Sequence, residues 1–248
     1  MSMVGIEDLW REYLRVYADP GVSSELQSRW GADPNVVQGR VQFAYPPTFQ
    51  PGYVGARFAE SDSRILFIGV NPGEGKQFSS QVDDAVLAKQ LTGFREGHLS
   101  LAELSAFQSG HVTKWPIYRE KGIFSETGDA SIELLPKPLR PSVQSVALLN
   151  LFPFKTKDNK PPLSGYGGSN SLKTHMWECL VKPTIESLAP RVIVRYPSSD
   201  KYAPQLEQLR SRPCIVRVWH PSDRNLTASR ESLADSWVPL ATQMALLK

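Results

Sequence analysis

Two short polar stretches, about 150 residues apart, each come directly after an apolar run. Asn71 lies in the sequence Gly-Val-Asn-Pro-Gly after the run 65–68, and His220 lies in His-Pro-Ser after the apolar residues 214–216 and 218–219. Continuous apolar runs of this length are typical of strands that helices cover on both faces of a parallel sheet. Side chains just beyond the carboxyl ends of such strands converge on one crevice. We therefore expect the carboxamide and the imidazole to meet in a pocket that can support chemistry.

The remaining elements are predicted from the same kind of pattern. Two further apolar runs, 146–149 and 192–194, end at polar residues. Segments with helical spacing separate the four runs. Alternating strands and helices imply crossover connections and a parallel sheet. The sequence predicts a three-layer α/β/α sandwich with a central four-stranded parallel sheet. The helical spacing is carried by these residues: Leu87, Leu91 and Phe94; Leu172, Met176 and Leu180; Tyr202, Leu206 and Leu209.

Length and composition indicate one domain over residues 1–248, with 1–60 as a helical and loop extension packed on it. The chain has 248 residues and 41% apolar content, enough for one large core. It has no apolar run of the roughly 20 residues that a membrane span needs, and Glu7 and Asp8 stand near its start. We expect a cytoplasmic monomer that binds no membrane. Cys179 and Cys214 have no metal-ligand spacing and are expected to be reduced core residues.

Charge placement is more informative than net charge, which is only +3 and excludes a uniform basic coat for nucleic acid. Basic residues cluster in loops near the predicted strand ends, where they could form a local positive face along a phosphate backbone. An ordinary solvated group of charges is an equally open interpretation. In the segment 96–140 the aromatic residues form either a lid or a packing layer, and packing is the favoured interpretation. The basic residues are Lys137, Arg140, Lys155, Lys157, Lys160, Arg224 and Arg230; the aromatic ones are Trp115, Tyr118 and Phe124.

Three motifs together resemble the uracil-DNA glycosylase superfamily. They are 69–73, Asn150 at the end of a strand, and 220–222. The resemblance is closest to the branches with G-x-N-P-G as first motif, the single-strand-selective monofunctional and the mismatch-specific enzymes. The stretch 220–225 is similar to H-P-S-P-R-N of the former, with Asp223 in place of the second proline. The order of strands and helices extends the match to residues 60–230.

The resemblance implies hydrolysis of the N-glycosidic bond of uracil in flipped-out DNA nucleotides, as in base excision repair, without metal or organic cofactor. The Asn150 carboxamide carries the donor and acceptor that match uracil O4 and N3–H, and cytosine presents the reverse pattern. His220 is the expected donor to the uracil O2, on which negative charge develops. Asn71 cannot serve as a base, so its carbonyl oxygen is expected to orient the attacking water. Gly69 and Val70 are expected to bind the uracil, and Pro72 and Gly73 to shape a tight turn that brings backbone N–H groups close to the base.

Further residues are expected to stack on the base or to hold the DNA. Phe78 is the nearest aromatic residue after the first motif, although relatives generally carry theirs several residues later. Arg224 corresponds to the residue that some relatives insert into the duplex gap. The hydroxyls of Ser198 and Ser222 suit phosphate oxygens, as does the Lys155 ammonium.

Three other functions were weighed against glycosylase activity. The segment 69–76 does not have P-loop spacing, and Gln77 stands where Ser or Thr should bind magnesium. The chain contains no G-x-S-x-G nucleophile elbow. One alternative therefore stays open, a catalytically weak or inactive protein of the same fold that binds DNA or abasic sites.

Overall fold

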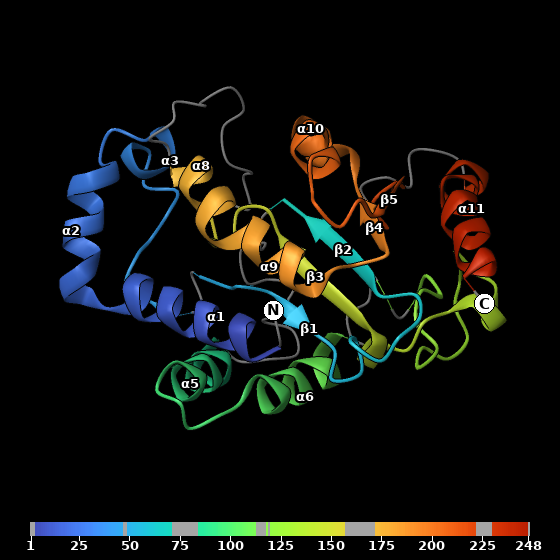
Figure 1. Ribbon diagram of the computed structural model, residues 1–248, viewed down its shortest axis with the longest axis horizontal. Coiled ribbons are helices and arrows are strands. Elements are labelled where there is room, and N and C mark those ends of the chain that lie inside the picture. Colours follow the sequence, from blue (N-terminus) through green and yellow to red (C-terminus); the bar gives the residue numbers. More distant parts are fainter. Residues whose placement is uncertain are drawn as a thin grey trace. The chain divides into compact units, whose positions relative to one another are not determined.

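The computed structural model describes residues 3–46, 49–70, 84–112, 118, 120–156, 172–221 and 230–247 (Figure 1). It is a mixed α/β structure around one five-stranded sheet with the order β1-β3-β2-β4-β5. The strands are β1 (Tyr53–Val54), β2 (Ile65–Gly69), β3 (Val146–Asn150), β4 (Val192–Arg195) and β5 (Cys214–Arg217).

The four strands predicted from apolar runs are all present, but the predicted total of four was wrong. The fifth strand, β1, pairs antiparallel with β3, while β2–β4 and β4–β5 pair in parallel. With two residues, β1 is too short to show a periodic pattern in the sequence. It is anchored by the Tyr53 hydroxyl, which donates a hydrogen bond to the Val143 carbonyl at 2.9 Å. The three-layer arrangement of helices stays a prediction.

Burial differs between the central strands and the edge strand. Every residue of β2 except Gly69, and every residue of β4 except Arg195, is buried. This fits strands with both faces covered. Of the edge strand β5 only Val216 is buried, and from there burial alternates: Val216 and Val218 are buried, whereas Arg217 and Trp219 are exposed. One face of this edge is therefore open to solvent.

The described residues group into two compact units. Unit 1 consists of Met1–Gly52, Gly69–Leu104 and Leu149–Leu188; unit 2 consists of Tyr53–Ile68, Ser105–Leu148 and Ala189–Lys248. That both belong to a single domain stays a prediction. The helices of unit 1 are α1 (Met3–Ala18), α2 (Pro20–Trp30), α3 (Pro34–Val37), α5 (Asp84–Arg95), α8 (Leu172–Met176), the π-helical turn η5 (Trp177–Val181) and α9 (Lys182–Leu188). Those of unit 2 are η2 (Lys137–Leu139), η3 (Val143–Ser145), η6 (Pro197–Tyr202), α10 (Ala203–Glu207) and α11 (Arg230–Leu246), and α6 (Leu101–Val112) begins in unit 1 and ends in unit 2.

The N-terminal segment 1–30 forms two helices. The first, α1, buries one apolar face and packs against α2, α5 and α9. The second begins at Pro20, and the Asp19 carboxylate caps it by accepting hydrogen bonds from the Gly21 and Val22 amides. The buried Asp33 carboxylate caps α3 and also accepts a hydrogen bond from the Leu172 amide at the start of α8. The fully buried residues of the α1 face include Ile6, Trp10, Leu14 and Tyr17.

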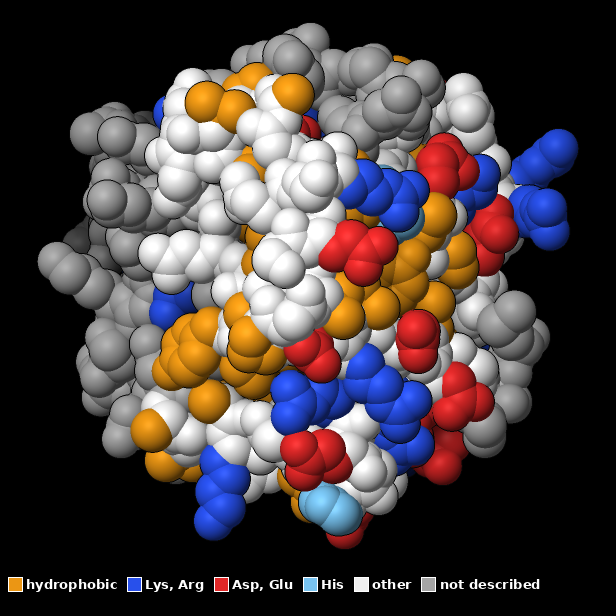
Figure 2. All heavy atoms as spheres, turned by 90° about the vertical axis from the view of Figure 1, so that its left-hand side faces the viewer, with side chains coloured by type: hydrophobic (Ala, Val, Ile, Leu, Met, Phe, Trp, Pro, Cys, Tyr) orange, Lys and Arg blue, Asp and Glu red, His pale blue; other side chains and the backbone are white. Residues whose placement is uncertain are grey.

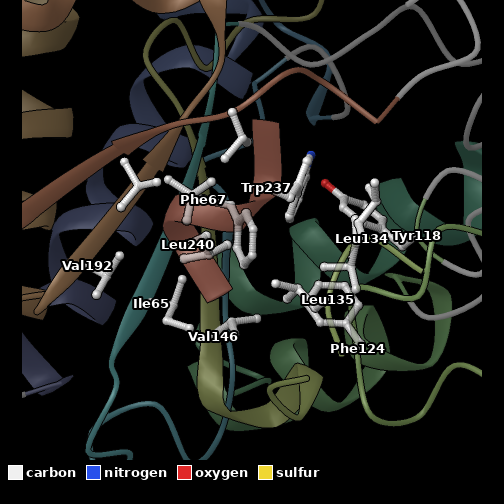
Figure 3. Close-up of a cluster of buried hydrophobic side chains, with 14 of the residues drawn as sticks. Ile65, Phe67, Tyr118, Phe124, Leu134, Leu135, Val146, Val192, Trp237 and Leu240 are labelled. Atoms are coloured by element: carbon white, nitrogen blue, oxygen red, sulfur yellow. The ribbon is translucent and has the colours of Figure 1, made fainter. Parts of the chain in front are cut away.

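The core of unit 2 contains side chains from the sheet, from the segment 118–143 and from α11 (Figure 3). The indole of Trp237 is fully buried and tilted against the ring of Phe67, with centroids 6.4 Å apart. Tyr118 and Phe124 are also buried, which confirms the packing interpretation for these two aromatic residues. The sequence analysis did not predict α11, although Leu233, Trp237, Leu240 and Met244 repeat at helical spacing and are all buried.

Two composition-based expectations have different outcomes. No helix within the described ranges has the length and apolar character that a bilayer crossing demands. Cys179 and Cys214 are free, but both are exposed, so the prediction that they lie in the core was wrong. Cys179 lies in the π-helical turn and Cys214 at the start of the edge strand.

Candidate functional site

The side chain of Asn150 lies directly over the backbone of Gly69. A Cβ atom added to Gly69 would stand 2.6 Å from Asn150 Oδ1, closer than real Cβ contacts. The backbone of Gly69 does not have a positive φ. The absence of a side chain at Gly69 therefore serves the close approach of the carboxamide and not an unusual backbone conformation.

Backbone hydrogen bonds fix this pair at the ends of β2 and β3. The Leu151 amide donates to the Gly69 carbonyl at 3.0 Å, and the Phe152 amide donates to the Val70 carbonyl at 2.7 Å. Leu151 and Phe152 are fully buried and Val70 is nearly so, whereas Asn150 is partly exposed. Within the part of the chain that the structure describes, the Asn150 carboxamide makes no hydrogen bond. A rigid backbone thus presents a donor and an acceptor that no described protein group uses.

His220 lies in unit 2, three residues beyond Arg217, the last paired residue of β5. Its ring packs edge-to-face on Tyr196, with centroids 4.5 Å apart and an angle of 70° between the planes. Some of the imidazole is exposed, but burial lowers the pKa of His220 to about 4. At neutral pH the ring is therefore uncharged, with one nitrogen that donates and one that accepts a hydrogen bond.

Tyr196 is a second aromatic residue at this place, and sequence analysis did not assign it a role. It follows β4 directly, and its carbonyl accepts hydrogen bonds from the amide and the hydroxyl of Ser199. Burial raises the pKa of Tyr196 well above its ordinary value, and an interaction with the Tyr118 hydroxyl raises it further. Burial also raises the pKa of Tyr118, to about 12. Both phenols are neutral near pH 7, so the imidazole packs against an uncharged aromatic ring.

The residue before His220 is held by α11 through its backbone. The Trp219 amide donates to Ser236 Oγ at 3.1 Å, and the Trp219 carbonyl accepts from Trp237 Nε1 at 3.1 Å. The Ser236 hydroxyl itself donates to the Leu233 carbonyl, which orients it as an acceptor for Trp219. Since both polar backbone groups of Trp219 are bound to a helix that packs in the core, the chain enters His220 in a fixed direction.

Residues predicted to hold DNA have mixed surroundings. Ser198 is exposed and Lys155 is partly exposed. Lys137 is exposed and lies 3.7 Å from Asp129. Arg140 is buried, donating to the Leu135 carbonyl and to Glu133, so its proposed part in a basic surface was wrong. On the face in Figure 2, Lys and Arg side chains are interspersed with Asp and Glu, and no continuous basic surface is visible there.

The remaining predicted site residues lie outside the described ranges. These are Asn71, Phe78, Ser222 and Arg224, together with Lys157 and Lys160 of the basic loops. The structure therefore brings together Gly69 and Asn150 in unit 1, and it places His220 against Tyr196 in unit 2. Among the described residues there is also no group of three or more His, Cys, Asp or Glu side chains suited to a metal ion.

Sequence analysis missed a charged cluster next to the His220 segment. Asp200 of η6 accepts hydrogen bonds from Arg195 and Arg217, which are paired residues of the neighbouring strands β4 and β5. The one sequence signal near this cluster was Arg217, a charged residue that interrupts the apolar residues 214–216 and 218–219 and indicates a strand with one open face.

Compared with known protein families and with curated protein sequences, the chain matches none.

Proposed function

We propose that this chain is a DNA glycosylase that hydrolyses the N-glycosidic bond of uracil in DNA and leaves an abasic site. The observation that carries the proposal is the Asn150 carboxamide over Gly69, held by a rigid backbone and without a hydrogen-bond partner among the described residues. A three-layer α/β/α fold, a monomeric state, DNA as the partner and a cytoplasmic location are parts of the same proposal.

Asn150 is proposed to select the base. Its Nδ2–H donates to uracil O4 and its Oδ1 accepts from uracil N3–H. Cytosine carries a donor and an acceptor at the corresponding positions in the opposite order, so its insertion leaves buried polar groups unpaired. Such mismatches cost far more than a lost hydrogen bond in water, because each unpaired group is also removed from solvent.

His220 is proposed to stabilise the departing base. When the C1′–N1 bond breaks, its electron pair goes to the base and negative charge builds up on O2. A neutral imidazole still carries one N–H, so His220 can donate a hydrogen bond to this oxygen without being protonated first. The lowered pKa of His220, which burial causes, supports this neutral role. The hydrogen bonds from α11 to Trp219 support a fixed position for the ring.

The other roles rest on the sequence. Asn71 is proposed to orient the water whose oxygen bonds to C1′ and whose proton passes to solvent. Phe78 is proposed to stack on the base. Ser198, Ser222, Arg224 and Lys155 are proposed to contact the DNA backbone or the gap left by the flipped nucleotide.

The test is base release from an oligonucleotide that carries one deoxyuridine, read as strand cleavage in alkali at the abasic site. The full chain is expected to release uracil, while Asn150→Ala and His220→Ala lose most of this activity and keep their unfolding temperature. His98→Ala is the matched control, because the His98 side chain is 75% exposed and its neighbour Glu96 lies on the surface. Undiminished release by both site variants would refute the assignment. Binding to the oligonucleotide without any release would instead favour the non-enzymatic DNA-binding alternative.

A further inference from the structure

A surface of four residues lies at the carboxyl ends of β4 and β5, within unit 2. It consists of Arg195, Asp200, Arg217 and Trp219 and is called the Arg–Trp surface below. Arg195 and Arg217 are direct partners in the parallel register of the two strands. Trp219 lies two residues after Arg217, on the same face of the edge strand.

The charges on this surface are not balanced. Like charges on directly paired residues of neighbouring strands repel each other. Asp200 bridges the two guanidinium groups: Arg217 reaches its oxygens through Nε and Nη2 at 3.0 Å each, and Arg195 binds through Nη1. This pairing lowers the pKa of Asp200, chiefly through the hydrogen bonds from Arg217. Two cations share one carboxylate, so one positive charge remains. Arg195 Nε is also buried, and no group of the described residues accepts a hydrogen bond from it.

Trp219 adds an exposed ring whose backbone is already fixed. Its side chain is 41% exposed, while its amide and carbonyl are both bound by α11. The Arg217 guanidinium lies over the indole, 5.9 Å from the ring centroid. A rigid aromatic side chain on a fixed backbone loses little conformational entropy on binding a ligand. The ring and the cations are therefore prepared for a ligand that has both a flat π-face and a negative charge.

We propose that the Arg–Trp surface binds an unpaired nucleotide of a DNA strand, with the base stacked on Trp219 and its phosphate on the Arg217 and Arg195 guanidiniums. The choice of DNA as the partner rests on the proposed function. Stacking on an aromatic side chain needs a base whose face is free, which a paired base inside a duplex does not offer. The arginine fork suits phosphate oxygens as well as it suits the carboxylate that now occupies it.

This proposal assigns Asp200 a definite role. Its carboxylate competes with the phosphate for the same guanidinium donors, so its removal strengthens binding. Neutralising any exposed carboxylate favours an anionic ligand through net charge, so the gain at Asp200 is compared with that of Glu60→Gln, which removes the same charge from the exposed Arg57–Glu60 pair. A gain at Asp200 that exceeds the gain at Glu60 separates a binding site from an ordinary charged surface.

The experiment measures binding of a short single-stranded oligothymidylate without uracil, by fluorescence anisotropy at several salt concentrations. Trp219→Ala is expected to weaken binding about 5- to 150-fold, and Trp219→Phe to restore part of the loss. Arg217→Gln is expected to reduce the slope of log K against log salt by about 0.7. Asp200→Asn is expected to tighten binding more than Glu60→Gln does. Arg57→Gln is the matched control, because Arg57 is exposed and pairs with a single carboxylate, Glu60.

Each outcome is decisive. The proposal is overturned if Trp219→Ala binds like the wild type, if Asp200→Asn tightens binding no more than Glu60→Gln does, or if Arg57→Gln alters the salt slope as much as Arg217→Gln does. Because the oligonucleotide contains no uracil, base release does not enter the measurement. If the variants change binding as expected but no substrate releases uracil, the proposed glycosylase function is refuted and the proposal on the Arg–Trp surface stands. If uracil is released but the variants bind like the wild type, the proposal on the Arg–Trp surface is refuted and the glycosylase function stands.

Discussion

Replacing Gly69 by Ala tests the base-recognition argument without removing any polar group. The new Cβ would stand 2.6 Å from Asn150 Oδ1, and ordinary contacts begin near 3.4 Å, so the oxygen has to move by about 0.8 Å. The Asn150 side chain can turn away at a cost of about 1 kcal/mol in rotamer strain. Alanine also lowers the conformational entropy of the unfolded chain, and the Gly69 backbone is compatible with Ala. This stabilises the folded state by a similar amount and offsets the rotamer strain. Stability is thus expected to change little.

Activity should respond much more strongly. A displacement approaching 1 Å at a positioning group lowers catalytic rates by up to about 100-fold. We therefore expect kcat/KM for uracil release from single-stranded DNA to fall by about 10- to 100-fold in Gly69→Ala, with an unfolding temperature within a few degrees of the wild type. Gly110→Ala is the control, since a Cβ at Gly110 meets nothing within 4 Å. If Gly69→Ala releases uracil at the wild-type rate, the carboxamide does not need its observed position, and the reasoning on Asn150 is refuted.

Three further predictions concern stability. Since burial lowers the pKa of His220 to about 4, the unfolded chain binds a proton more readily than the folded one between pH 6.5 and 4. The wild type should lose about 2 kcal/mol more than His220→Gln as pH falls through this window, measured by urea unfolding; equal losses would contradict the lowered pKa. Gly55→Ala should cost about 3 kcal/mol in thermal unfolding, because its Cβ would lie 2.2 Å from the Gln144 carbonyl oxygen, and a cost below that of a surface substitution would contradict the contact. Thr184→Val should cost about 1–3 kcal/mol by leaving the buried Trp10 Nε1–H without an acceptor, whereas the exposed Thr242→Val should be nearly neutral.

The sequence predicted the central strands because their apolar runs are long enough to be distinctive. β2 and β4 begin at the predicted residues and extend one residue beyond each run. β1 escaped prediction because a strand of two residues has no measurable period. α11 was missed although its buried residues repeat at helical spacing, since Pro239 within the helix is a strong breaker signal.

The candidate site was predictable in part. The position of Asn150 at a strand end followed from an apolar run, but its contact with Gly69 depends on the neighbouring strand and could not be read from either segment alone. The same holds for Tyr196 under His220, since the two residues follow different strands. Arg140 appeared to be a surface cation, and its burial depends on the carbonyl of Leu135 and on Glu133 nearby, which a count of charges does not reveal.

The order in which the chain leaves the ribosome gives the contacts of α11 a consequence for biogenesis. The Trp219–His220 segment is synthesised before Ser236 and Trp237, which bind its backbone. The same helix supplies Leu233, Leu240 and Met244 to the core of unit 2, so the strands emerge with part of their apolar surface uncovered. A nascent chain halted before α11 would therefore have an unanchored histidine segment and an incomplete core, and it would depend on chaperones until the helix emerges.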